Sequence, residues 1–140
     1  MPGDIQAVTR IVKASLGEAY PPSLYITIHN LWPQGFLVVQ EGRDLVGFAA
    51  AVVSGTKVAR VLMLAVLPEH RRRSIGQILM QALYEACALN GIDTVSLEVR
   101  KSNVSALQFY RKQGYDVEGE IKNFYSNGED AYKLVKVLRS

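Results

Sequence analysis

Cysteine is almost missing from this chain of 140 residues, since Cys87 is the only one. A single cysteine forms no disulfide within the chain, and a reducing compartment is then the default. His29 and His70 are the only histidines and stand far apart in the sequence, so they make no metal-ligand pattern with one cysteine. The sequence therefore predicts neither a disulfide-stabilised scaffold nor a metal site. Cys87 lies mid-helix by pattern, which favours a structural thiol over a nucleophile.

Long hydrophobic runs are missing as well. No apolar run reaches the length that a membrane span needs. The first residues show no basic start followed by an apolar region, which a signal peptide requires. We also find no repeat, low-complexity segment or linker, so a single domain over residues 1–140 is predicted. We expect a cytoplasmic protein without membrane contact, either a monomer or a homodimer.

A strong excess of one charge is the third feature that the sequence lacks. The formal net charge is +3, with 49% apolar and 21% charged residues, which is typical of a globular protein. Acidic and basic residues are interspersed, and only Arg71 to Arg73 forms a compact basic run. The chain also lacks the signature of RNA-recognition domains. Nucleic acid is therefore not the expected partner, whereas a modest positive balance suits a pocket for phosphates.

What the sequence does contain is a pattern for anion binding over residues 62–79. A buried strand, a short basic turn and the first turn of an amphipathic helix follow one another there. N–H groups at a helix N-terminus lack partners within the helix, and the helix dipole adds partial positive charge. Pyrophosphate is the natural ligand of such a site. The alternative is an arginine run on a solvated surface ahead of an ordinary core helix.

Hydrophobic periodicity and turn signals divide the chain into helices and strands. Helical periodicity covers about 4–16, 22–31, 74–90 and 103–113. Strand patterns cover 36–39, 45–53, 58–67, 93–100, about 115–125 and about 130–138. The run 58–67 is nearly continuous in apolar residues, which predicts a central strand covered on both faces. The fold class is therefore α/β, in the order α-α-β-β-β-α-β-α-β-β.

The residues Arg71, Ser74 and Gly76 resemble motif A of the GNAT superfamily of N-acetyltransferases, which reads Q/R-x-x-G-x-G/A. In that family the amides of the motif hold the pyrophosphate of acetyl-CoA. The resemblance implies a mixed, mostly antiparallel sheet with helices on both faces. It implies an acetyl-CoA site made of Leu64, Ala65, Val66, Arg71, Arg72, Arg73, Ser74, Ile75, Gly76, Gln77 and Asn103. Ser74 replaces the first glycine of the motif; its N–H still donates and its side chain is able to cap a helix, but it adds bulk near the phosphates.

A second stretch, 97–115, reads LEVRKSNVSALQFYRKQGY. It resembles L-E-V-R-x-S-N-x-x-A-x-x-L-Y-x-x-x-G-F of the branch that acetylates protein N-termini. This branch includes RimI-type ribosomal-protein-alanine acetyltransferases and the archaeal and eukaryotic N-terminal acetyltransferase catalytic subunits. The segment 123–131 resembles the R/N-x-Y-Y-x-x-G-E-D-A of the same branch. The likeness covers the chain from about residue 36 to its end.

Acetyl transfer needs a neutral amine and a protonated leaving group. An α-amino group has a pKa near 7.7–8.0, so a carboxylate that takes its proton assists the attack. The resemblance assigns that base role to Glu98, on the polar face of its strand; the alternative is a solvated glutamate paired with Arg100 or a lysine. The resemblance assigns to Tyr110 the role of the acid that protonates the departing thiolate. The alternative is that Tyr110 is a core residue. The two are compatible, because the ring packs in the core while the hydroxyl reaches the sulfur.

Cofactor and acceptor contacts also follow from the resemblance. In the family a splayed or bulged strand, here Leu64 to Val66, bonds the pantetheine arm and aims an N–H at the thioester oxygen; the alternative is ordinary strand pairing. Asn103 either contacts the cofactor arm or only caps a helix. The loop that contains Glu18 and Tyr20 is similar to L-P-E-N-Y-P of the archaeal-type enzymes. By that similarity these two residues, with Tyr125, would hold the incoming N-terminus. The alternative for both tyrosines is ordinary packing.

The sequence thus predicts an enzyme that transfers acetyl from acetyl-CoA directly to a primary amine. The expected acceptor is the N-terminal α-amine of a protein, a ribosomal protein being one specific case. The first alternative is a GNAT acetyltransferase of a lysine side chain or a small amine. The second is a non-catalytic module that binds acyl-CoA, or RNA through Arg71 to Arg73.

Overall fold

The computed structural model describes residues 6–12, 22–68 and 74–138. The helical elements are residues 6–12, α2 (Pro22–Leu31), the 3-10 turn η1 (Pro33–Gly35), α3 (Ile75–Leu89) and α4 (Val104–Lys112). The strands are β1 (Phe36–Glu41), β2 (Asp44–Ser54), β3 (Val58–Val66), β4 (Thr94–Arg100), β5 (Asp116–Ile121) and β6 (Ala131–Val137). Within the described residues this is the order that the hydrophobic patterns predict.

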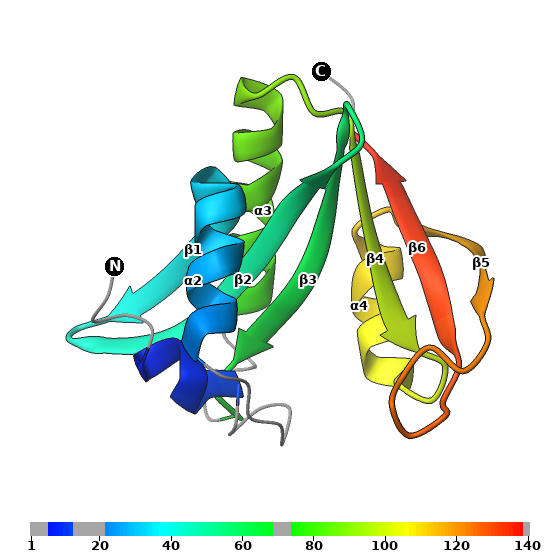
Figure 1. Cartoon of the computed structure of the whole chain (residues 1–140), viewed down its shortest axis with the longest axis horizontal. Coiled ribbons are helices and arrows are strands. Elements are labelled where there is room, and N and C mark those ends of the chain that lie inside the picture. The colour runs from blue at the N-terminus through cyan, green and yellow to red at the C-terminus, as the bar shows by residue number, and fades with distance from the viewer. Residues whose placement is uncertain (1–5, 13–21, 69–73, 139–140) are drawn as a thin grey trace.

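The strands form one sheet in the order β1-β2-β3-β4-β6-β5. Only the central pair, β3 and β4, is parallel, because α3 connects them as a crossover; the other neighbours are antiparallel. Helices cover both faces (Figure 1): α2 lies on one side, and α3 and α4 lie on the other. The predicted mixed, mostly antiparallel α/β fold is confirmed.

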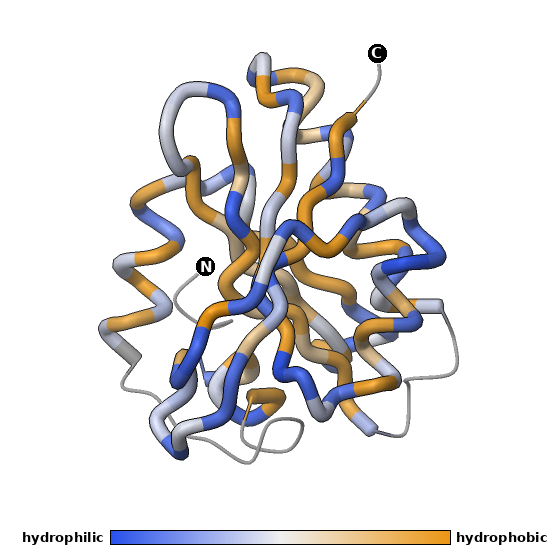
Figure 2. The backbone as a smooth tube through the Cα atoms, turned by 90° about the vertical axis from the view of Figure 1, so that its right-hand side faces the viewer, coloured by the Kyte–Doolittle hydropathy of each residue, from blue (hydrophilic) through white to orange (hydrophobic). Residues whose placement is uncertain are grey.

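Two apolar layers hold the sheet between these helices. On one face, Phe36 and Phe48 pack with residues of the 6–12 segment and with Tyr25 of α2. On the other face, α3 and α4 cover the alternating residues Val95 and Leu97 of β4, as the pattern predicts. Figure 2 shows the hydrophobic parts of the chain converging on the middle of the molecule, whereas many hydrophilic parts lie in its outer loops.

The prediction for the strand at 115–125 is wrong at its far end, because β5 stops at Ile121. Residues 122–130 instead form a loop with its own hydrogen bonds. Asn123 adopts a left-handed backbone with φ 53°, and its N–H donates to Asp130 Oδ1 at 2.9 Å. Asn-Gly is a sequence typical of turns, and Asn127-Gly128 does lie in one, since the Gly128 N–H donates to the Tyr125 carbonyl at 2.9 Å. This loop places Phe124 and Tyr125 beside the centre of the sheet.

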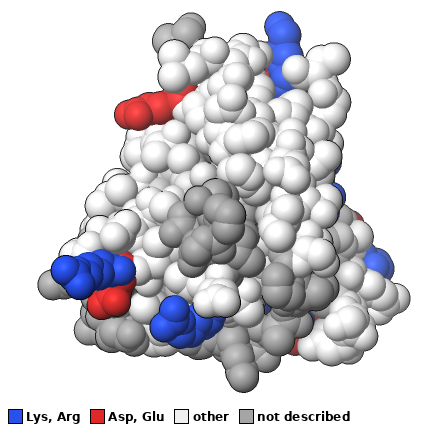
Figure 3. All heavy atoms as spheres, turned by 60° about the vertical axis from the view of Figure 1, so that its left-hand side comes forward, with Lys and Arg blue, Asp and Glu red and all other residues white. Residues whose placement is uncertain are grey.

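The face over α2 and β1 carries few charged side chains (Figure 3). The α2 sequence, PSLYITIHNL, contains no lysine, arginine, aspartate or glutamate. Across the three described ranges, no helix is both long and apolar enough to cross a membrane.

Candidate active site

A cleft opens at the centre of the sheet, where β3 and β4 separate. Their register runs only from Val58 opposite Thr94 to Arg60 opposite Ser96 (Figure 1). Where β3 pairs with β2, it carries a bulge. Ala50 of β2 pairs with Met63 and Ala51 pairs with Val61, so Leu62 is the extra residue of the bulge. A cavity of about 540 Å³ lies between the separated strands. The run 58–67 is central as predicted, but its middle is not covered, since Leu62 is 38% exposed.

Five of the residues predicted for the site line this one cavity. They come from β3, β4, the α4 region and the 122–130 loop, and they are Leu64, Glu98, Asn103, Tyr110 and Tyr125. The bulge falls at Leu62 and so precedes the segment Leu64 to Val66 that the resemblance indicated. Leu64 borders the cavity, whereas the side chains of Ala65 and Val66 are buried in the core.

Glu98 reaches across the start of the cleft to Arg60 of β3. Arg60 Nε and Nη2 both donate to Glu98 Oε1, at 3.1 and 2.9 Å. The Glu98 side chain is only 11% exposed. The sequence alternative named Arg100 or a lysine as its ion partner, and the structure shows Arg60 in that place. Glu98 Oε2 has no hydrogen-bond partner among the described residues, so this oxygen is available to a ligand.

Tyr110 is 8% exposed and belongs both to the core and to the cleft. Its ring packs edge-to-face on Phe109 and Tyr115, with centroids 5.1 and 5.3 Å apart. Burial, with a smaller contribution from Tyr84 and Tyr125, raises the pKa of Tyr110 above its usual range. No residue in the described ranges hydrogen-bonds its hydroxyl. The group is therefore a protonated donor without a partner in the described part of the protein.

Asn103 is the N-cap of α4. Its side-chain oxygen accepts the Ala106 N–H at 3.1 Å, which satisfies one of the free donors of the helix. The capping interpretation of Asn103 from the sequence is therefore confirmed. The cap leaves the Asn103 amide NH₂ facing no hydrogen-bond acceptor in the described segments, in a side chain that lines the cleft.

Tyr125 is held at the cleft by Arg100. The Arg100 guanidinium lies 4.0 Å above the centroid of the Tyr125 ring. Arg100 also donates to Asn127 Oδ1 at 3.3 Å and lies 3.6 Å from Glu129 Oε2. The same arginine thus ties β4 to both sides of the 122–130 loop.

The start of α3 is the predicted phosphate site. Ser74 is its N-cap and has φ 60° and ψ 23°, the left-handed region that glycine adopts without strain. Its side chain makes no capping hydrogen bond, so the expected capping role is not seen. Ile75 is buried, Gln77 is exposed, and a Cβ at Gly76 would lie 3.3 Å from Phe109 Cζ. Gly76 therefore lets α3 and α4 approach each other closely.

Some predicted residues lie outside the described ranges. These are Glu18 and Tyr20 of the acceptor loop, and Arg71, Arg72 and Arg73 of the basic turn.

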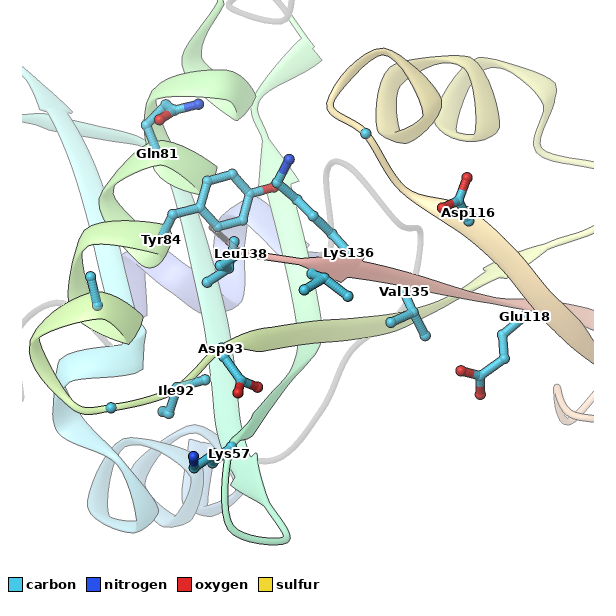
Figure 4. A pocket seen from close by; sticks show the side chains of 14 residues that line it. Lys57, Gln81, Tyr84, Ile92, Asp93, Asp116, Glu118, Val135, Lys136 and Leu138 are labelled. Atoms are coloured by element: carbon cyan, nitrogen blue, oxygen red, sulfur yellow. The ribbon is translucent and has the colours of Figure 1, made fainter. Parts of the chain in front are cut away.

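A larger hollow of about 1140 Å³ lies elsewhere, between α3, β5 and β6 (Figure 4). It contains none of the predicted site residues. Tyr84 of α3 and Lys136 of β6 point toward each other there, with the Lys136 ammonium 5.5 Å from the ring centroid (Figure 4). The Tyr84 hydroxyl bonds Gln113 Oε1 at 2.8 Å and the Tyr115 hydroxyl at 2.9 Å, and Lys136 donates to the Gln113 carbonyl. These polar groups are engaged with one another.

Cys87 is fully buried in α3, and burial raises the pKa of its thiol to about 11. This is the structural environment that its place in the helix predicts. Within the parts of the chain that the structure describes, no three His, Cys, Asp or Glu side chains come together to hold a metal ion.

The sequence reasoning missed Arg60 and Phe124. Arg60 interrupts the otherwise apolar run 58–67 in the middle of a predicted central strand, and this was the available signal. A charged residue in such a strand needs a partner. Phe124 lines the cleft beside Tyr125 and is 38% exposed.

Comparison with known proteins now identifies the family. Residues 5–115 match the model of the Acetyltransferase (GNAT) family. The crystal structure of Ard1 from Thermoplasma volcanium is 34% identical, with a TM-score of 0.96, covering 100% of this chain and 95% of that one. An N-alpha-acetyltransferase of Sulfurisphaera tokodaii is 28% identical over 96% of this chain and 88% of its own length. An uncharacterised N-acetyltransferase of Methanocaldococcus jannaschii is 31% identical over 95% of this chain and 85% of its own length.

The chain belongs to the GNAT family of acetyltransferases. It is an acetyl-CoA-dependent N-acetyltransferase, as the motif at the start of α3 predicted.

Proposed function

We propose that this enzyme acetylates the N-terminal α-amine of proteins, with Glu98 as base and Tyr110 as acid. The observation that carries the proposal is that Glu98 and Tyr110 line the same cleft, where β3 and β4 separate. Each side chain has an oxygen atom there that forms no hydrogen bond to a described residue. The names of the relatives support the acceptor class: the Sulfurisphaera protein is an N-alpha-acetyltransferase. A ribosomal-protein N-terminus is one acceptor to test.

Acetyl-CoA would lie along the cleft and against the start of α3. The backbone amides of Ser74, Ile75, Gly76 and Gln77 would bind its pyrophosphate, together with Arg71, Arg72 and Arg73. The fit rests on two features of the structure. The β3–β4 ladder ends at Arg60, so Leu64, which lines the cleft, has no β4 residue in register with it, and the Asn103 side chain borders the same cavity. When bound, acetyl-CoA supplies the acetyl group as a reactive thioester.

The side chains of the cleft would move the protons. Glu98 takes a proton from the α-ammonium, directly or through water, and the neutral nitrogen forms the new C–N bond. As the C–S bond breaks, Tyr110 gives its proton to the departing sulfur and recovers one from the nitrogen or from solvent. The net products are an acetylated amine, free CoA and one proton. A backbone N–H of the bulged strand would stabilise the oxyanion.

Tyr125 of the 122–130 loop would hold the incoming acceptor, together with Glu18 and Tyr20, which lie outside the described residues. Tyr125, fixed by Arg100, lines the cleft on that loop, and this supports its assignment as an acceptor contact. Leu62 and Phe124 add exposed apolar surface to the same cavity.

Calorimetric titration with acetyl-CoA, followed by CoA release against peptides, tests the proposal. Three matched peptides of one sequence are used: one with a free N-terminus, one with a blocked N-terminus and an internal lysine, and one with both amines blocked. We expect release only with the free N-terminus. Release with the lysine peptide alone would assign a lysine acceptor, and binding without any release would favour a small amine or a non-catalytic role.

A further inference from the structure

Arg60 occupies a particular place in the sheet. It is the last residue of β3 that is in register with β4, opposite Ser96. Its guanidinium reaches two residues further along β4 and donates twice to Glu98 Oε1, at 3.1 and 2.9 Å. The two strands are therefore joined by side-chain hydrogen bonds at the point where their backbone ladder stops.

Other cations lie near Glu98 but are engaged elsewhere. Lys133 of β6 is opposite Glu98 in register, yet its ammonium lies 3.1 Å from Glu118 Oε1 on β5. Arg100, two residues further along β4, lies over the Tyr125 ring. Among the described residues, Arg60 is therefore the cation that forms an ion pair with Glu98.

We infer that Arg60 is a positioning residue for acetyl transfer: it fixes the Glu98 carboxylate through Oε1 and leaves Oε2 to receive the proton of the acceptor amine. This inference rests on the proposed role of Glu98 as base. Arg60 is not assigned any contact with the acetyl group or the amine.

Two physical reasons support the assignment. A glutamate side chain has several rotatable bonds, and two hydrogen bonds to one oxygen restrict the carboxylate to one arrangement, which removes an entropic cost from the reaction. A carboxylate that is only 11% exposed is also costly to bury without a partner charge, and Arg60 supplies that charge.

The geometry also explains why arginine suits the position better than lysine. The guanidinium presents Nε–H and Nη2–H in a rigid, planar arrangement, and both reach the same oxygen. A lysine would keep the charge but offer a flexible single point of contact. We therefore expect Arg60→Lys to restore part of what Arg60→Gln loses.

A double-mutant cycle tests the inference, using Arg60→Gln, Glu98→Gln and the double variant with saturating acetyl-CoA and the free-N-terminus peptide. We expect Arg60→Gln to lower kcat about tenfold in the wild type but by less than about twofold in the Glu98→Gln background, because Arg60 acts through Glu98. Acetyl-CoA affinity should stay within about twofold throughout. Arg43→Gln, in the β1–β2 turn, is the matched control and should behave as wild type.

The outcomes separate the two proposals. If Arg60→Gln lowers kcat by the same factor in both backgrounds, Arg60 only stabilises the sheet, and the inference is overturned. If kcat is unchanged by Arg60→Gln while Glu98→Gln is impaired, Arg60 has no role and the base stands. If Glu98→Gln is as active as wild type, the base role fails and the inference fails with it. Thermal melting of each variant identifies losses that are due to unfolding.

Discussion

The hollow beside α3 and β6 and the cleft between β3 and β4 differ in what their polar groups do. In the larger one, Tyr84 of α3 and Lys136 of β6 line the hollow, and both bond groups beside it: Tyr84 bonds Gln113 and Tyr115, and Lys136 bonds the Gln113 carbonyl. In the smaller one, between β3 and β4, the Tyr110 hydroxyl and Glu98 Oε2 have no hydrogen-bond partner in the described residues. The larger hollow has about twice the volume, 1140 against 540 Å³.

The cleft that we propose as the active site is therefore the smaller of these two cavities. A polar group that lines a cleft without a bond to a described residue keeps its hydrogen-bonding capacity for a ligand. The cleft also lies where the backbone ladder between β3 and β4 stops, at Arg60. Removing one hydroxyl from each hollow should therefore give opposite results, and this sets the first two predictions.

Tyr110→Phe should give the largest effect. The substitution removes the proposed proton donor, so kcat should fall about 100-fold or more. Stability should hardly change, because no described residue loses a hydrogen bond, and the acetyl-CoA Kd should stay within about twofold. Steady-state kinetics, calorimetric titration and thermal melting measure the three quantities. An unchanged kcat, with chemistry shown to be rate-limiting, would remove Tyr110 from the acid role.

Tyr84→Phe is the same chemical change in the larger hollow. It deletes the hydrogen bonds to Gln113 and Tyr115, and leaves a half-buried amide oxygen without its donor. We expect a loss of about 1–2 kcal/mol in the free energy of unfolding, measured with urea, and an unchanged kcat. A fall in kcat at full stability would mean that the larger hollow takes part in the reaction.

Asn103 separates the helix cap from the proposed cofactor contact. Asn103→Ala removes both and should cost about 1 kcal/mol in stability. Asn103→Asp keeps an oxygen that caps Ala106 but lacks the NH₂ group, so stability should be retained while acetyl-CoA binds more weakly. If Asn103→Asp binds acetyl-CoA as tightly as the wild type does, Asn103 only caps the helix.

Ser74→Gly should have the smallest effect. Ser74 has a positive φ at the start of α3, and glycine relieves the strain of that conformation, about 1 kcal/mol. The free energy of unfolding should rise by this order, and acetyl-CoA affinity should be kept or tightened because the backbone amides stay in place. A large loss of affinity would show that the serine side chain itself contributes to binding.

Local patterns in the sequence predicted most of the elements. The 22–31 and 74–90 helices match α2 and α3 to within one residue at either end, because their apolar spacing and the Asn90-Gly91 stop are local signals. The end of β5 was missed for a physical reason. The Asn127-Gly128 turn specifies a reversal of the chain but not how far the strands extend toward it, and the bond from Asn123 to Asp130 closes the loop earlier.

The sequence by itself determined the family and its chemistry, since Arg71, Ser74, Gly76 and the stretch around Glu98 and Tyr110 are matched by spacing along the chain. Only the tertiary structure decided where β3 separates from β4. It also decided which cation pairs with the Glu98 carboxylate, namely Arg60, which lies 38 residues earlier in the chain. Periodicity tells which face of a strand is buried. The register between strands distant in the chain depends on how helices and bulges pack around them, and this is a property of the whole fold.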